Sequence, residues 1–247
     1  MKERLQKLIS AAGLCSRRRA EEWIAEGKVT VNGDLARVGD SADPETDEIR
    51  VNGQPLTPAP IRTTTVLLYK PRGVVTTMQD EKGRPTVAEL LPPALGRLYP
   101  VGRLDQFSEG LLLMTNDGAL ANRLTHPSQT VKKTYHLWVS GWHEAALEAL
   151  RLPIVLDGYQ IQPPTVRLLW QREGVARLEI TIHEGRNRQI RRMAEAAGLT
   201  PTRLKRVAEG GLTLGDLQPG QWRILTEAER AALLQIENGK CRIEEEL

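Results

Sequence analysis

The segment GRLDQFSEGLLLMTNDG, residues 102–118, decides how this chain is interpreted. Its second half, residues 111–114, is an apolar run that ends at turn-forming residues, so we expect a buried strand that turns at residues 116–118. Its first half places Arg103 and Asp105 two residues apart between glycines, on a loop at the mouth of that strand. Loops held by a rigid scaffold often carry reactive groups. The segment therefore predicts a core strand and a candidate reactive carboxylate, Asp105.

The flanking sequence alternates between strand and helix patterns without a regular repeat. Apolar residues predict strands over 66–69, 135–139 and 178–182, and a helical pattern runs from Asn187 to Gly198. Thr-x-x-Glu capping boxes at residues 86–89 and 226–229 predict two further helix starts, the second of them for a final helix. Irregular interleaving of this kind favours an α+β fold over a doubly wound sheet.

The first 55 residues predict a small separate unit. A helix over 3–12 should end at Gly13, and Ser16 should cap a second helix that runs to Gly27. Asn-Gly pairs follow β-branched runs at residues 29–33 and 49–53, which predicts two hairpins. Prolines at positions 55, 58 and 60 then predict a stiff linker. We expect domains at 1–60 and 61–230, followed by a helical and acidic tail at 231–247.

Composition narrows the class of protein. The 247 residues are 40% hydrophobic and 26% charged, with a net charge of +3, which is ordinary for a globular chain. The basic residues are clustered: residues 183–206 hold seven against two acidic ones (7 − 2 = +5), and Arg17, Arg18 and Arg19 are consecutive. Such clusters suit a polyanionic partner.

Other classes of function lack their signatures. Two cysteines make no disulfide framework, and the four histidines lack zinc-ligand spacing, so we expect neither metal nor cofactor. No apolar run approaches the length of a membrane span, and no signal peptide is evident at the start. We therefore expect a cytoplasmic protein that is not bound to a membrane.

Each candidate site segment also has an ordinary structural explanation. A loop Asp beside an Arg can be a turn residue with a surface ion pair worth about 0–1 kcal/mol. Tyr135, in the segment Lys133-Thr134-Tyr135, can be a packing residue. The segment EGRNRQIRR, residues 184–192, feeds four arginines into the start of a helix, where the macrodipole disfavours cations. Contacts to phosphate would offset that penalty.

Taken together, the segments match one family. Residues 102–118 resemble the catalytic motif of ribosomal pseudouridine synthases of the RsuA/RluB type, with Ser108 where the family commonly has Thr. Residues 70–73, 126–127, 133–135 and 184–193 resemble the other motifs in the same order. Residues 3–53 resemble the S-four-type RNA-binding module of this family. The segments Pro-Arg-Gly at 71–73 and Gly-Arg-Pro-Thr at 83–86 are most similar to the RluB branch, which acts on large-subunit rRNA.

The resemblance implies a fold, a reaction and a set of roles. The catalytic domain should be a mostly antiparallel mixed sheet flanked by helices, and the reaction converts uridine to pseudouridine on a flipped-out base. Asp105 would be the catalytic carboxylate, Tyr135 would stack on the uracil or take its C5 proton, and Arg191 would favour the anionic form of Asp105. The remaining RNA contacts implied are Arg103, which would enter the RNA stack, and Lys70, Arg186, Arg188, Arg192, Arg17, Arg18 and Arg19. Whether Asp105 attacks carbon or removes a proton stays open.

The partner implied is ribosomal RNA, 23S rRNA by the branch resemblance, either alone or in an assembling subunit, and a monomer is the default for the family. Three alternatives stay open: a synthase of the RsuA type that acts on 16S rRNA, a non-catalytic ribosome-assembly factor, and a glycoside hydrolase that uses Asp105 and Glu109 as a carboxylate pair. The presence of Asp105, Tyr135 and Arg191 together favours an enzyme over the assembly factor. The ten aromatic residues of the chain are few for a sugar cleft.

Overall fold

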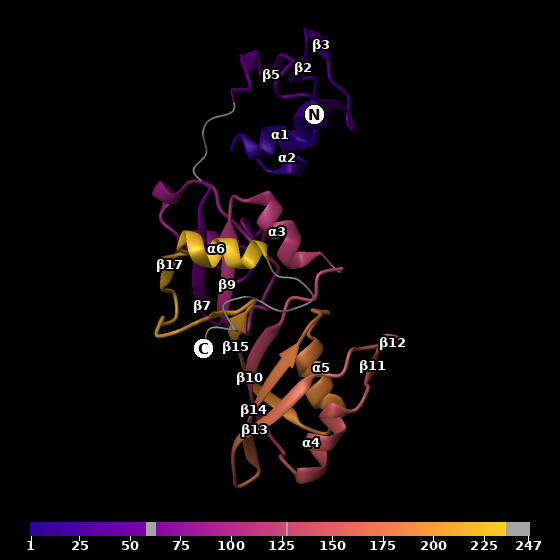
Figure 1. The fold of residues 1–247 in the computed structure, drawn as a ribbon, viewed down its shortest axis with the longest axis vertical. Helices are drawn as coiled ribbons and strands as arrows, with labels where there is room; N and C mark the ends of the chain where they lie inside the picture. The colour runs from indigo at the N-terminus through magenta and orange to yellow at the C-terminus, as the bar shows by residue number, and fades with distance from the viewer. Residues whose placement is uncertain (58–62, 127, 236–247) are drawn as a thin grey trace. The chain divides into compact units, whose positions relative to one another are not determined.

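The computed structural model describes residues 1–57, 63–126 and 128–235. Its packing divides the chain into two compact units, and the boundary in the chain lies between Thr63 and Thr64. The expected linker prolines at 58 and 60, the Pro127 of the His-Pro motif and the acidic end of the tail lie outside the described residues. The fold class is α+β, as the sequence predicted (Figure 1).

The first unit follows the sequence signals closely. Ser16 accepts a hydrogen bond from the Arg19 amide and caps a helix, and Gly13 has φ +80°, as expected for the glycine after a helix. A two-residue strand precedes the first helix, which therefore starts at Leu5 instead of residue 3. The elements of this unit are β1 (Glu3–Arg4), α1 (Leu5–Ala11), α2 (Arg17–Ala25), β2 (Val29–Val31), β3 (Asp34–Leu35), β4 (Ser41–Ala42), β5 (Ile49–Val51) and β6 (Gln54–Pro55).

Both expected hairpins form. The central residues of each turn have positive φ, 53° and 91° at Asn32-Gly33 and 52° and 77° at Asn52-Gly53, which is the conformation that Asn-Gly pairs favour. The strands join in the order β3-β2-β5-β6. Helices α1 and α2 contribute Leu5, Ile9 and Ile24 to the core of the unit. The exposed arginines at the start of α2 therefore stand on a small but packed scaffold.

The second unit is built on one large mixed sheet. In the described part of the chain the strands run in the order β13-β14-β10-β15-β9-β7-β17, with β16 beside β15 and β8 beside β9. All pairs are antiparallel except β15 with β9. The strands are β7 (Thr65–Lys70), β8 (Tyr99–Pro100), β9 (Glu109–Thr115), β10 (Lys133–Ser140), β11 (Val155–Leu156), β12 (Tyr159–Gln160), β13 (Thr165–Arg172), β14 (Val175–Ile182), β15 (Thr200–Glu209), β16 (Leu212–Thr213) and β17 (Trp222–Ile224).

The helices of the second unit cover two different parts of the large sheet (Figure 1). Two of them, α4 and α5, pack with Leu137, Leu178 and Ile180 in one core, while α3 and α6 pack with Leu67 and Leu113 in another. None of the helices in the described ranges is long and apolar enough to cross a membrane. The helices are η1 (Val87–Leu90), η2 (Pro93–Leu95), α3 (Gly118–Thr125), α4 (Glu144–Arg151), α5 (Gln189–Ala196) and α6 (Glu227–Leu234).

The parallel contact between β9 and β15 depends on Gly110. Its φ is +105°, and a Cβ added there would lie 2.1 Å from the carbonyl oxygen of Arg206. A larger residue would force the two strands apart, because no real Cβ contact is that short. Tyr135 of β10 and Leu204 of β15 line the same cleft as the loop that carries Asp105.

Two sequence expectations need adjustment. The helix expected from Asn187 starts at Gln189, with Arg188 before it at φ 50° in the left-handed region. Two of the four clustered arginines, Arg186 and Arg188, therefore precede the helix instead of lying in it. The expected boundary between residues 230 and 231 falls inside α6, whose Leu233 is fully buried against the sheet, so this helix belongs to the second unit.

Candidate active site

An open cleft of about 820 Å³ contains Asp105. The cleft is lined by the loop between β8 and β9, by Tyr135 of β10, by the segment before α5 and by residues 75–84. Asp105 is half-buried. In the described residues its carboxylate has neither a hydrogen bond nor an ion pair. The carboxylate singled out from the sequence is therefore available to a ligand in the cleft.

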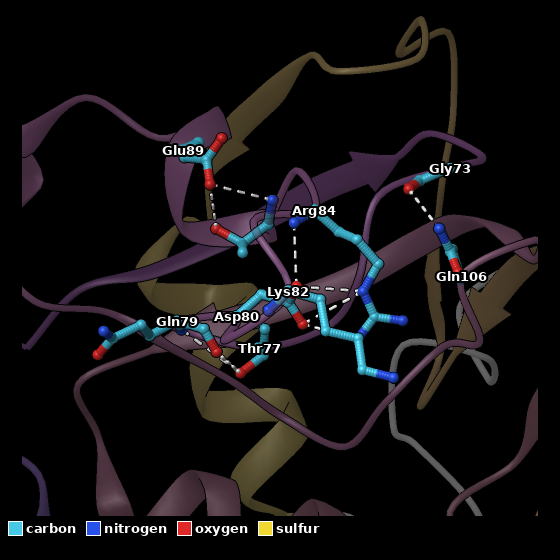
Figure 2. A network of polar contacts seen from close by, with 9 residues as sticks. Gly73, Thr77, Gln79, Asp80, Lys82, Arg84, Glu89 and Gln106 are labelled. Carbon is cyan, nitrogen blue, oxygen red and sulfur yellow. Dashed lines mark hydrogen bonds and ion pairs between the residues drawn. The ribbon is translucent and has the colours of Figure 1, made fainter.

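The backbone around Asp105 is fixed at both sides. Thr76 Oγ1 donates to the Leu104 carbonyl at 2.7 Å and lies 3.3 Å from the Leu104 amide, and the Gly73 amide donates to the Gln106 carbonyl at 2.8 Å. Figure 2 shows the reciprocal bond, from the Gln106 side chain to the Gly73 carbonyl at 3.2 Å. The backbone hydrogen bonds on both sides therefore fix the position from which the Asp105 carboxylate enters the cleft.

The buried side chain of Lys70 donates hydrogen bonds to backbone carbonyls of this loop. Its side chain is wholly buried, and its ammonium donates to the carbonyls of Pro71 at 2.9 Å and Ser108 at 2.8 Å, with Gln106 at 3.4 Å. Burial lowers the pKa of Lys70 to about 8, against the opposing charges of Asp105 and Glu109. The expectation that Lys70 contacts phosphate is wrong for this structure, because carbonyl oxygens already occupy its ammonium and no surface of it is accessible.

Arg191 contacts the same loop from the other side. Arg191 is 9% exposed, and its guanidinium donates through Nη2 to the Phe107 carbonyl at 3.2 Å and lies 3.4 Å from Ser108 Oγ. Burial lowers the pKa of Arg191, and the charge of Asp105 opposes that shift. No ion pair joins Arg191 to Asp105 among the described residues. The expected direct partnership is therefore replaced by contact through the loop backbone and a longer-range attraction.

Tyr135 forms an inner wall of the cleft and is 7% exposed. Burial raises the pKa of Tyr135, so its phenol stays protonated at neutral pH. Next to Tyr135 in the sheet, β15 carries a buried ion pair that no local sequence pattern predicts. Arg206, 2% exposed, lies 3.2 Å from Glu209 and donates through Nε to the Leu111 carbonyl at 2.7 Å.

The cleft is also lined by a loop with a second carboxylate, Asp80, shown in Figure 2. Asp80 accepts hydrogen bonds from the amides of Lys82 (3.1 Å) and Arg84 (2.9 Å) and from the Arg84 guanidinium (2.7 Å). The hydrogen bond from the Arg84 side chain is the main cause that lowers the pKa of Asp80 to about 2. In the sequence, the motif at residues 83–86 indicated a branch of the family. Asp80 and Arg84 were not predicted to line the cleft.

The predicted RNA-binding arginines of this unit divide into two groups. Arg103, Arg186 and Arg188 are exposed and line the cleft, and the Arg186 guanidinium lies 3.3 Å from the Tyr159 ring centroid. Arg192 does not line the cleft and makes a two-bond pair with Asp157, at 2.7 and 2.8 Å. The first group is therefore placed to meet a polyanion that enters the cleft.

In the first unit, Arg17 and Arg18 are exposed, whereas Arg19 pairs with Glu22 and lies 5.9 Å from the Trp23 ring centroid. The consecutive arginines are thus not equivalent. Elsewhere, within the described residues, His, Cys, Asp and Glu side chains form no group of three that could hold a metal ion.

The geometry does not provide the carboxylate pair of a glycoside hydrolase. Glu109 is only 4% exposed, and its oxygens accept from Arg203 at 2.6 Å and from the Tyr69 hydroxyl at 2.8 Å. These partners lower its pKa against the effect of burial. A buried, satisfied Glu109 cannot share a substrate with Asp105, so this alternative is removed.

Comparison with known proteins identifies the class. The family model for RNA pseudouridylate synthase matches residues 64–196, and the S4 domain model matches residues 3–49. The chain belongs to the RNA pseudouridine synthase family and carries an S4 domain, as the sequence motifs predicted.

Its relatives cover nearly the whole chain. It is 44% identical over 231 residues to "Ribosomal large subunit pseudouridine synthase B" of Bacillus subtilis (strain 168), covering 92% of this chain and 93% of that one. It is 40% identical over 238 residues to an uncharacterised RNA pseudouridine synthase of Aquifex aeolicus (strain VF5), covering 95% of each. A solved pseudouridylate synthase structure is 30% identical, with a TM-score of 0.67, and covers 93% of this chain and 99% of that one.

Proposed function

We propose that this enzyme isomerises a specific uridine of large-subunit ribosomal RNA to pseudouridine. One observation carries the proposal: Asp105, whose carboxylate has no partner among the described residues, lies on a hydrogen-bonded loop in the cleft that Tyr135 also lines. The likeness to the large-subunit enzyme of Bacillus subtilis supports the choice of substrate. The partner is then ribosomal RNA, as a naked strand or in an assembling subunit.

The reaction breaks the N1–C1′ bond of uridine and makes a C5–C1′ bond on the rotated base. A proton leaves C5 and N1 gains one, so no electrons are exchanged with a cofactor. Asp105 begins this sequence as an anion, acting at the ribose carbon or at a proton of the nucleoside. Because the phenol of Tyr135 stays protonated, we assign Tyr135 to stacking on the uracil and favour Asp105 over Tyr135 as the acceptor of the C5 proton.

Other residues position the catalytic carboxylate and the RNA. Lys70 donates to the Ser108 carbonyl and Arg191 to the Phe107 carbonyl, so both act through the loop backbone. Arg103, Arg186 and Arg188 line the cleft as cations for the RNA strand, with Arg103 suited to occupy the stack that the target base leaves, because its guanidinium is planar. In the S4 domain, Arg17 and Arg18 add phosphate contacts.

The test is carbodiimide-adduct primer extension on small- and large-subunit rRNA treated with the wild type or with Asp105→Asn. We expect a new stop in large-subunit rRNA with the wild type alone, and the position of the stop names the uridine. A stop in small-subunit rRNA would move the enzyme to the RsuA-type alternative. Intact RNA binding with no stop on rRNA or on subunit precursors would support a non-catalytic assembly factor instead.

A further inference from the structure

The large sheet carries a second organised cluster of cations on the face away from the cleft. Residues directly opposite each other on antiparallel strands share a face. The register pairs Trp138 of β10 with Arg177 of β14 and with Arg203 of β15, and it pairs Arg177 with Trp170 of β13. The next row pairs His136 with Glu179 and Lys205. These two rows form what we call the outer ladder: Trp170, Arg177, Trp138 and Arg203, then Arg167, Glu179, His136 and Lys205.

The outer ladder is separate from the catalytic cleft. Trp138 lies three residues from Tyr135 along β10, so the two side chains point to opposite faces, and Tyr135 faces the cleft. Helices α4 and α5 pack on the Tyr135 face. The ladder is partly accessible: Trp170 is 50% exposed, and the side chains of Arg167 and Arg203 are 71% and 43% exposed, whereas Arg177 and Lys205 are half-buried.

Stacking holds the ladder in a fixed arrangement. The guanidinium carbons of Arg177 and Arg203 lie 5.0 and 4.6 Å from the Trp138 ring centroid, and the Lys205 ammonium lies 4.8 Å from the Tyr69 ring centroid. Cation–π contacts of this kind limit the side-chain freedom of long basic residues. Arg177, Arg203 and Lys205 are therefore held against aromatic rings in the protein alone.

The positive charge of the ladder is only half compensated. Arg203 pairs with Glu109, and Arg167 pairs with Glu179. Among the described residues, Arg177 and Lys205 make no ion pair with a carboxylate within 4 Å. Four cations thus face two carboxylates, which leaves a local charge of 4 − 2 = +2 over neighbouring strands.

Arg177 is only partly satisfied by its protein partners. Its Nη2 contacts His136 Nδ1 at 2.7 Å, and a guanidinium can only donate, so His136 must accept and is neutral. Its Nε is buried and has no hydrogen-bond partner in the part of the chain that the structure describes. The pKa of His136 is lowered mainly by burial and next by the charge of Arg177. The pKa of Lys205 is lowered mainly by burial and next by the charge of Arg203. Crowded cations of this kind destabilise the protein alone and are stabilised by a bound anion.

We propose that the outer ladder is a second RNA-binding surface, which contacts the phosphodiester backbone of ribosomal RNA beyond the stem that enters the cleft. This inference rests on the proposed function, because it assumes an RNA substrate. Ordered guanidiniums suit phosphate oxygens through paired hydrogen bonds. The exposed ring of Trp170 at the end of the row offers a stacking surface for an unpaired base. An acidic protein would match the charge but would make no use of the stacked rings.

The test compares a long large-subunit rRNA fragment with a short stem-loop around the uridine found by primer extension. The variant is Arg177→Gln with Lys205→Gln in the full chain, and the matched control is Arg151→Gln, an exposed arginine of α4 that pairs with Glu148. We expect the double variant to bind the long fragment about 5- to 20-fold more weakly at 0.1 M salt, with a salt slope smaller by about 1.5. Turnover of the short stem-loop should stay at the wild-type rate, which shows that the variant is folded.

The outcomes separate this inference from the proposed function. Wild-type affinity and an unchanged salt slope for the long fragment would overturn the outer ladder as an RNA surface. If affinity for bare RNA is unchanged but binding to subunit precursors falls, the surface belongs to a protein partner and the inference is wrong. Absence of pseudouridine with the wild type on any RNA would contradict the proposed function, whatever the ladder binds.

Discussion

Two loops line the cleft, and each carries one aspartate. Asp80 accepts hydrogen bonds from two backbone amides and the Arg84 guanidinium, and only 8% of its side chain is exposed. In the Asp105 loop the hydrogen bonds go to the backbone instead, and the carboxylate itself has no described partner. Hydrogen-bond satisfaction therefore separates a carboxylate that shapes a loop from one that is available for chemistry.

The largest expected effect tests that contrast directly. Asp105→Asn should reduce single-turnover pseudouridine formation by at least about 1000-fold with no loss of stability, because the amide keeps the shape and loses the anion. Asp80→Asn should reduce it by about tenfold only, through a less ordered Arg84. Equal losses in the two variants would mean that satisfaction of the carboxylate does not distinguish the two roles.

Arg191 contacts the Asp105 loop at two places, the Phe107 carbonyl and Ser108 Oγ. Arg191→Ala removes the donor to the Phe107 carbonyl and should slow turnover by about 100-fold, since a displacement near 1 Å can have that effect. Ser108→Ala removes only the weaker contact and should slow it by less than about threefold. Single-turnover rates at saturating enzyme separate these effects from RNA binding. Wild-type turnover in Arg191→Ala would show that Asp105 needs no support from α5.

Lys70 supports the same loop from within the core and should matter more for stability. Lys70→Met leaves the carbonyls of Pro71 and Ser108 without their donor, so we expect a loss of about 2–4 kcal/mol in the free energy of unfolding at pH 7. Denaturant unfolding measures the loss. A variant as stable as the wild type would show that the buried ammonium does not hold the loop.

The stability of the wild type should also depend on pH through this group. The pKa of Lys70 is about 8 in the folded protein, below its ordinary value of 10.5, so the folded state holds fewer protons between these pH values. The free energy of unfolding contributed by Lys70 therefore rises with pH from about 8 to about 10.5. The gap between wild type and Lys70→Met should widen over that window. A constant gap would contradict the lowered pKa.

Much of the molecule could be predicted from the sequence because its signals are local. Asn-Gly turns, the Ser16 cap and the two capping boxes are each satisfied within a few residues, and all form as expected. The Asp105 loop was recognisable because glycines, a reactive residue type and a core strand are adjacent in the chain. Local patterns of this kind need no knowledge of the tertiary fold.

What could not be predicted depends on long-range pairing. The burial of Lys70 and the pair Arg206–Glu209 follow from how β7, β9 and β15 lie beside each other, which no local pattern encodes. The same is true of the outer ladder, whose members come from four strands. A sequence motif also could not show that Arg191 contacts the loop backbone instead of Asp105 itself.

The smallest expected effect extends the contrast of satisfied and unsatisfied groups to the S4 domain. Arg17 and Arg18 are exposed with no described ion pair, whereas Arg19 pairs with Glu22. Because each phosphate contact releases counterions, Arg17→Gln with Arg18→Gln should reduce the slope of log affinity against log salt by about 1.5. Arg19→Gln should change it by less than about 0.5, since its charge is already neutralised locally. Filter binding to rRNA across a salt series gives both slopes. Equal changes would mean that RNA displaces Glu22 from Arg19, so that an ion pair seen in the protein alone does not predict which arginines bind.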